Sequence, residues 1–218
     1  LFFVASALRA AVEPNWQAPA YLSAIVLAAS SDREAHWGEA RARIFFRGSL
    51  ILAAATTFLI YVHAVLPFMP VNPARDPTGA GFGWSTLAAR VNAARSEALS
   101  TVTTWVGGER YQEASELAFH LPDHPVTFVI DVNGRPNQYD LWPSFPERAR
   151  RGDALILVLG LYTRPEDDPV IAALSPHFEH VRLREVIALR RGSIVRAFRR
   201  IWVLDGWHGD WPYTGLAR

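Results

Sequence analysis

The chain has 218 residues, of which 22 are basic and 21 acidic, so its formal net charge is +1. All of the basic residues are Arg, and they are interleaved with Asp and Glu, which argues against a protein that binds nucleic acid through a basic face. Because the chain contains no Cys, disulfide frameworks, thiolate nucleophiles and Cys-ligated zinc sites are excluded.

The beginning of the chain predicts two hydrophobic helices. Residues 1–8 (LFFVASAL) have the composition of the end of such a helix, without the basic region and small-residue cleavage site of a signal peptide. Residues 16–30 (WQAPAYLSAIVLAAS) are a second candidate span, short for a full crossing. We therefore expect the chain to be the C-terminal piece of a longer multi-pass membrane protein.

The most informative segment lies between Arg47 and Arg75, where no residue carries a formal charge. Its core, residues 49–70, holds roughly 20 apolar residues, which at a rise of 1.5 Å each match a hydrocarbon layer of ~30 Å. A third span is predicted from about residue 44 to residue 70. In a soluble protein, this stretch would have to be buried inside a domain.

The Arg residues predict how these helices are oriented. The link at residues 31–47 carries four Arg, which places it in the cytoplasm by the positive-inside rule. Residues 9–15 and everything after residue 70 then lie on the opposite side. We expect the C-terminal domain to lie on the non-cytoplasmic side of the membrane.

A linker rich in Pro and Gly, residues 71–83, separates this part from the rest of the chain. Beyond it, helices are predicted at residues 84–99, 110–120 and 168–174. Leu87, Val91 and Ala94 share one face of the first of these helices.

Strands are predicted at residues 101–106, 126–131 and 154–161. The third of these is a continuous apolar run, which is typical of a strand covered on both faces. Gly107 and Gly108 are expected to form a turn. Residues 180–189 and 193–204 flank a turn and predict an antiparallel hairpin whose Arg side chains alternate outward into solvent.

The predicted fold is thus a membrane α-helical segment of two to three transmembrane helices, residues 1–70, followed by a small mixed α/β domain with a C-terminal β-hairpin, residues 84–218.

Three clusters could carry chemistry, and the first is the loop VEPNWQAPAY, residues 12–21. It presents Glu13, Asn15, Trp16 and Tyr21 at the non-cytoplasmic ends of two spans, and its prolines stiffen it. The loop could bind a lipid-linked headgroup, or it could be a Pro-terminated loop with an interfacial aromatic residue.

The second cluster is Arg110, Tyr111 and Gln112 at the start of a predicted helix. Free backbone N–H groups at a helix start can meet an anion. An ordinary helix start after a strand explains the same residues.

The third and densest cluster lies in GRPNQYDLW, residues 134–142. Sugar-binding sites use such groups, because hydroxyls pair with guanidinium, amide and carboxylate groups while sugar C–H faces stack on aromatic planes. The cluster consists of Arg135, Asn137, Gln138, Tyr139, Asp140 and Trp142. No metal site or cofactor is indicated, because the seven His residues are scattered and no pair has the zincin spacing.

The sequence resembles the bacterial glycosyltransferase family 39, relatives of the dolichyl-phosphate-mannose–protein mannosyltransferases and of the aminoarabinose transferase that modifies lipid A. The resemblance covers most of the chain in the order expected for the C-terminal end of such enzymes. The matching segments are VEPNWQAPAY, DPTGAGFGWSTLAARV, RYQEASELAFHLP and GRPNQYDLW.

The resemblance implies a multi-pass enzyme of the bacterial inner membrane whose C-terminal domain lies in the periplasm. Such an enzyme takes a sugar from a polyprenyl-phosphate carrier and transfers it to a protein, lipid or glycan outside the cytoplasm. In that family the essential carboxylate lies in the first extracytoplasmic loop, so no catalytic residue is assigned in this chain. Two alternatives remain open. One is a membrane-tethered periplasmic binding or scaffold domain without catalysis; the other is a soluble nucleotide-binding α/β protein, which would need a phosphate loop that is not found.

Overall fold

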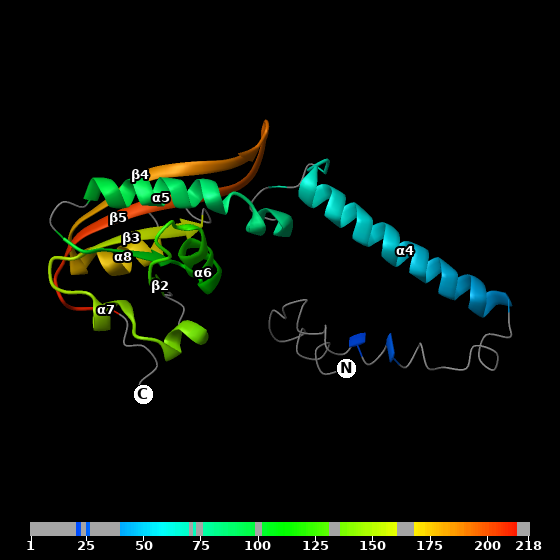
Figure 1. Ribbon diagram of the computed structural model, residues 1–218, viewed down its shortest axis with the longest axis horizontal. Helices are drawn as coiled ribbons and strands as arrows, with labels where there is room; N and C mark the ends of the chain where they lie inside the picture. Colours follow the sequence, from blue (N-terminus) through cyan, green and yellow to red (C-terminus); the bar gives the residue numbers. More distant parts are fainter. Residues whose placement is uncertain are drawn as a thin grey trace. The chain divides into compact units, whose positions relative to one another are not determined.

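The computed structural model describes residues 21–22, 25–26, 40–69, 72, 76–98, 102–130, 136–160 and 168–212 (Figure 1). By its internal contacts the chain divides into two compact units, Leu1–Val62 and His63–Arg218. The second unit carries the whole of the sheet.

Helix α4 spans Ala40–Val65. Within it, Arg43–Val65 is long and apolar enough to cross a membrane, and it is the one helix in the described part of the chain that meets this test. Almost none of that stretch is buried by protein, whereas the core helix of a soluble domain would be mostly buried. The helix ends two residues before Pro67, earlier than predicted, because a residue that precedes Pro is disfavoured in the α conformation. The other predicted spans fall almost entirely outside the described residues, so the number of spans stays a prediction.

A mixed five-stranded sheet with the order β2-β1-β3-β5-β4 forms the centre of the second unit. The first three strands are mutually parallel, and the last two form an antiparallel hairpin whose second strand pairs with β3. The strands are β1 Thr104–Gly108, β2 Thr127–Val129, β3 Ala154–Gly160, β4 Phe178–Arg191 and β5 Ile194–Trp207.

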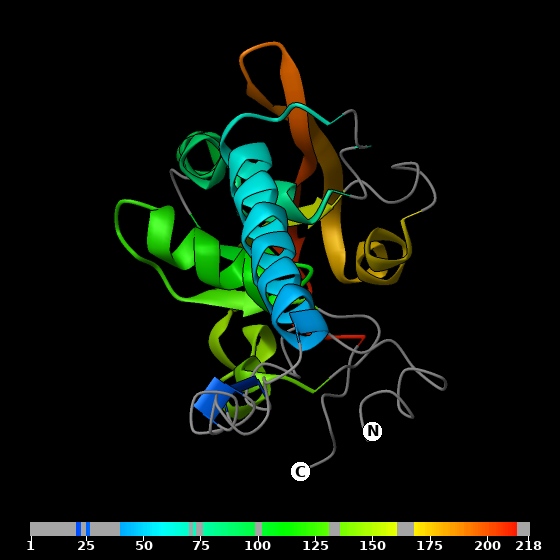
Figure 2. The ribbon, with the colours of Figure 1, turned by 90° about the vertical axis from the view of Figure 1, so that its right-hand side faces the viewer.

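Helices cover both faces of this sheet. Figure 2 shows α5 and α6 on one side of it and α8 on the other. The helices are α5 Trp84–Ala98, α6 Tyr111–His120, α7 Phe145–Arg148 and α8 Pro169–Leu174, and the 3-10 segments are η2 Pro77–Gly81, η3 Gln138–Leu141 and η5 Ser175–His177.

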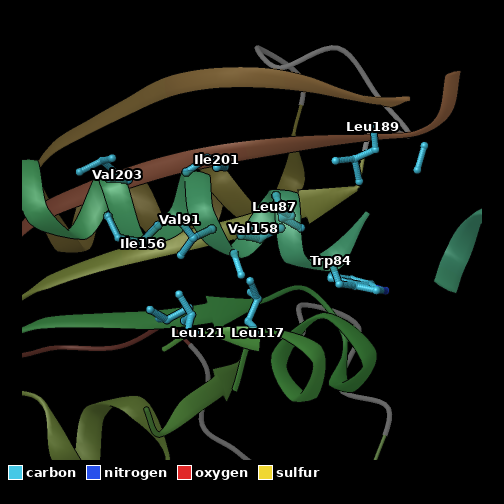
Figure 3. Packing of buried hydrophobic residues seen from close by; sticks show 14 residues of the cluster. Trp84, Leu87, Val91, Leu117, Leu121, Ile156, Val158, Leu189, Ile201 and Val203 are labelled. Atoms are coloured by element: carbon cyan, nitrogen blue, oxygen red, sulfur yellow. The ribbon is translucent and has the colours of Figure 1, made fainter. Parts of the chain in front are cut away.

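Strand β3 contributes to two hydrophobic cores, one on each face. Ile156 and Val158 pack with residues of α5 and α6, as Figure 3 shows. Leu155, Leu157 and Leu159 pack on the other face with α7 and α8. Every residue of β3 is buried, which confirms the prediction of a strand covered on both faces.

The predicted helices of this unit and its C-terminal hairpin are confirmed, with ends shifted by a few residues. The predicted turn at Gly107 and Gly108 is wrong, because both glycines lie in β1. A Cβ at Gly108 would lie 2.5 Å from the Cβ of Glu113. Glycine is therefore needed here for the close approach of α6 to the strand.

The prediction that the hairpin arginines alternate into solvent is wrong for three of them. Arg196, Arg199 and Arg200 on β5 are buried, with exposed fractions of 2%, 9% and 1%. Arg199 and Arg200 lie where β5 pairs with both β3 and β4 and is covered on both faces, so neither side chain reaches water. Arg196 lies beyond β3 and is covered instead by η2, where it contacts Asp76 and Thr78.

A buried ion pair lies at the start of the second unit. Asp76 Oδ2 is 2.9 Å from Arg196 Nη1 and 3.4 Å from His63 Nε2. The same carboxylate accepts hydrogen bonds from the N–H and the hydroxyl of Thr78 and so caps η2. The predicted linker thus contains an ordered segment that packs against β5.

Candidate functional site

A groove of about 1050 Å³ lies beside the edge strand β2. One wall is the second half of α6, and another is the segment from η3 to α7. The residues that lead into β2 and the strand itself, residues 124–129, complete the lining.

Aromatic side chains dominate the groove. The rings of Tyr139 and Trp142 pack edge to face with centroids 5.0 Å apart. Phe119, on the α6 wall, is 71% exposed, and Trp142 is 50% exposed. Exposed aromatic surface of this size that borders a groove is typical of a binding site. Such planes can stack on the C–H faces of a sugar ring.

Two carboxylates hold the segment from η3 to α7 in shape. Asp140 Oδ2 accepts a hydrogen bond of 2.7 Å from the N–H of Asn137, and Asn137 Oδ1 accepts one from the N–H of Tyr139. Glu147 Oε2 accepts from the N–H and hydroxyl of Ser144. Both arrangements are capping boxes. These hydrogen bonds fix the backbone that carries the aromatic residues of this segment. Binding a ligand would therefore cost little further conformational freedom.

His124 lines the groove and is held in place by a hydrogen bond. Its Nδ1 lies 3.2 Å from the carbonyl oxygen of Ala118, and since a carbonyl only accepts, the proton is on Nδ1 in the neutral ring. Nε2 is then the acceptor. The residue has a positive φ of 43°, so the backbone turns sharply here before β2.

The structure places Tyr139 and Asp140 in the groove, where they meet Trp142 of the same cluster. Asn137 and Gln138 lie at the start of η3 and do not line it; Asn137 acts through its capping bonds. Sequence reasoning missed Phe119 and His124. The one sequence signal for Phe119 was its place in RYQEASELAFHLP, a segment on which the family resemblance rests. That segment does not include His124.

The other predicted site residues do not join this groove. Arg110 is the residue before α6 and Tyr111 and Gln112 form its first turn, all outside the lining. Tyr21, in the first unit, is 59% exposed. The remaining predicted residues lie outside the described ones: Glu13, Asn15, Trp16 and Arg135.

A separate cluster of charged side chains lies near the ends of β1 and β3. Arg200 donates from Nε and Nη2 to the carbonyl of Gly160 and forms a short ion pair with Asp168. On the opposite face of the sheet, the guanidinium of Arg199 lies 5.3 Å from the ring centre of Trp84. The buried side-chain atoms without a hydrogen-bond partner among the described residues include Glu113 Oε2, Arg199 Nε and Arg200 Nη1. None of these side chains lines the groove.

Burial raises the pKa of the Glu113 carboxyl above its ordinary value of 4.5, and the positive charge of Arg199 offsets only part of this effect. A raised pKa means that the folded protein binds the proton more tightly than the unfolded chain does. The contribution of Glu113 to stability is therefore fully present below about pH 4.5 and is lost as pH rises through the folded-state pKa.

We predict that Glu113→Gln is more stable than the wild type at pH 7, because it removes a desolvated charge. The gain should shrink as pH falls toward 4. Urea unfolding of the full chain in detergent, followed by tryptophan fluorescence at several pH values, measures the difference. Glu116→Gln, on the same helix but with a side chain 41% exposed, is the matched control. A Glu113→Gln protein that is less stable at pH 7 would show that the carboxylate is needed in its charged form.

Two further findings concern possible metal ligands and similarity to known proteins. Within the described ranges, no group of three His, Asp or Glu side chains is placed to hold a metal ion. A scan against protein-family models and searches of curated proteins and of solved structures found no match, so the functional interpretation depends on the residues and their geometry.

Proposed function

We propose that this chain is the C-terminal part of a membrane glycosyltransferase that transfers a sugar from a polyprenyl-phosphate carrier to an acceptor outside the cytoplasm. Its α/β domain then contributes a sugar-binding groove on the periplasmic side of the bacterial inner membrane. The proposal includes two to three transmembrane helices, of which α4 is one.

The observation that carries the proposal is the groove itself. Tyr139 and Trp142, from the segment that resembles glycosyltransferase family 39, line one wall, and Phe119, from a second such segment, lines the other. Two separate matching segments, residues 110–122 and 134–142, therefore line the same groove. Aromatic planes beside fixed carboxylates suit a sugar, since its C–H faces stack and its hydroxyls donate to carboxylate oxygens.

The membrane part of the proposal is supported by α4. Its apolar stretch Arg43–Val65 has the length of a span and is almost unburied by protein. Exposed apolar side chains along a whole helix are costly in water and favourable in lipid. The four Arg of residues 31–47, before and at the start of this stretch, predict a cytoplasmic N-terminal end for it.

We expect Trp142→Ala to weaken binding of the sugar-bearing substrate on the order of tenfold, which corresponds to ~1.4 kcal/mol of lost stacking and apolar contact. The measurement is sugar transfer by the intact membrane enzyme as a function of donor and acceptor concentration, which shows whether the change lies in KM or in kcat. Because the groove binds and does not react in this proposal, the effect should fall on KM.

Tyr111→Ala provides the comparison between the two predicted clusters. It removes an exposed ring from the start of α6, outside the groove. An effect on KM from Trp142→Ala with none from Tyr111→Ala supports the groove. The reverse pattern, or no effect from either Trp142→Ala or Tyr139→Ala, would overturn it.

A second candidate function is a membrane-tethered periplasmic binding domain without catalysis. The structural roles of Asp140 and Glu147 favour this function. Their carboxylates cap η3 and α7 and so stabilise the wall of the groove. The gene sequence upstream separates the two. Many further spans and an acidic first extracytoplasmic loop support the enzyme, whereas a nearby start codon supports the tether.

A further inference from the structure

The β4–β5 hairpin is longer than the part of the sheet that supports it. Strand β3 pairs with β5 only from Arg199 to Leu204. Beyond that point, residues 194–198 of β5 and 188–191 of β4 continue as a two-stranded ribbon that projects past the end of β3 (Figure 1). We call residues 190–194 the hairpin tip.

The hairpin tip is basic and partly apolar. No acidic residue occurs between Glu185 and Asp205. Arg190 and Arg191 are exposed, and neither forms an ion pair with another described residue; Arg190 donates only to the carbonyl of Ser193. Ile194 is 43% exposed beside them. Cations next to an exposed aliphatic side chain match a lipid headgroup region, where phosphates lie above the acyl chains.

Contacts within the second unit connect the hairpin tip to the end of α4. His63, in the last turn of α4, contacts Asp76, and Asp76 pairs with Arg196 of β5. Arg196 is two residues from Ile194, or roughly 7 Å along the strand. A membrane-spanning α4 has its last turn at the headgroups, and these contacts within the second unit bring the hairpin tip near that turn.

The residues that follow α4 also carry exposed apolar side chains. Leu66, Phe68 and Met69 are exposed by 64%, 53% and 43%. The ring of Phe68 packs edge-on against His63, so this segment lies beside the ion pair that leads to Arg196. Exposed apolar side chains at this place are expected where the chain leaves a bilayer.

We propose that the hairpin tip binds the surface of the membrane that α4 spans. Arg190 and Arg191 contact lipid phosphates, and the side chain of Ile194 enters the boundary between headgroups and acyl chains. This inference rests on the membrane insertion of α4 in the proposed function. A second attachment point beside the helix end restricts how the α/β domain can turn above the bilayer.

The absence of Cys from the chain makes a direct test possible. Single substitutions Ile194→Cys, Ser175→Cys and Leu59→Cys are labelled with an environment-sensitive fluorophore. The full chain is then reconstituted in nanodiscs of phosphatidylcholine and phosphatidylglycerol that contain quencher-labelled lipids. Ser175 is the control for an exposed position away from the membrane. It lies near Phe178, which pairs with Trp207 at the end of the hairpin opposite the tip. Leu59 reports on α4.

We expect strong quenching at position 59, clear quenching at 194 and little at 175. Arg190→Glu with Arg191→Glu should reduce the quenching at 194 toward that at 175, because each Arg near an anionic surface contributes about a fivefold factor in binding. Nanodiscs of phosphatidylcholine alone should give the same reduction.

The outcomes separate this inference from the proposed function. Quenching at 59 with none at 194 would overturn the docking of the hairpin tip and leave the membrane helix intact. No quenching at 59 would overturn the membrane assignment itself. Quenching at 194 that is insensitive to charge reversal would overturn the role given to Arg190 and Arg191.

Discussion

Arg200→Met is expected to destabilise the α/β domain by about 3–5 kcal/mol, the usual cost of removing one partner from a buried ion pair. Asp168, which is 4% exposed, would keep its charge without its partner. The carbonyl of Gly160 would also lose both of its bonds from the guanidinium. The measurement is thermal unfolding of the full chain in detergent, in which we expect the midpoint to fall on the order of 10 °C.

Two further variants identify the source of this loss. Arg182→Met removes an Arg whose side chain is 53% exposed and pairs with Asp205 at 3.7 Å, and it should cost no more than about 1 kcal/mol. Arg200→Met combined with Asp168→Asn removes both buried charges and should be more stable than Arg200→Met alone. If the double variant is the less stable one, the unpaired charge is not the cause.

Asp76→Asn is expected to produce the second large effect, a loss of about 3 kcal/mol at pH 7. It leaves Arg196, which is 2% exposed, without a negative partner. Asp205→Asn, on the exposed pair with Arg182, is the matched control.

The effect of Asp76→Asn should depend on pH. Burial raises the pKa of Asp76, but the hydrogen bonds from Thr78 and the charge of Arg196 outweigh burial and hold the pKa below its ordinary value of 3.8. Because its pKa is lowered in the folded state, the ionised Asp76 stabilises the protein above about pH 3.8. This contribution is lost as pH falls through the folded-state pKa. The wild type and Asp76→Asn should therefore converge in stability at low pH. A difference that stays constant down to pH 2 would contradict the role assigned to the charge.

Local sequence patterns predicted the secondary structure where one signal dominated. The apolar run of β3 contains no polar residue, which is typical of a strand covered on both faces. A helix was predicted at residues 168–174, and Asp168 caps it by accepting from the N–H groups of Val170 and Ile171. Tyr139, Asp140 and Trp142 were predicted as one cluster because they are adjacent in sequence.

The groove could be predicted only in part. Phe119 and Tyr139 come from separate segments, and nothing in their local pattern shows that the chain folds back past β2 to bring them together. Glu113 has the helix-start position that a solvated carboxylate would have. Its burial depends on Gly108, which lets α6 approach the strand.

The sequence by itself determined the apolar helix and the alternation of strands and helices, because these follow from composition and periodicity over a few neighbouring residues. Only the tertiary structure decided which arginines are buried. In β5 both faces are covered, so Arg199 and Arg200 on opposite faces are enclosed alike. Whether a charge reaches water depends on what packs against its strand, and that information is distributed along the whole chain.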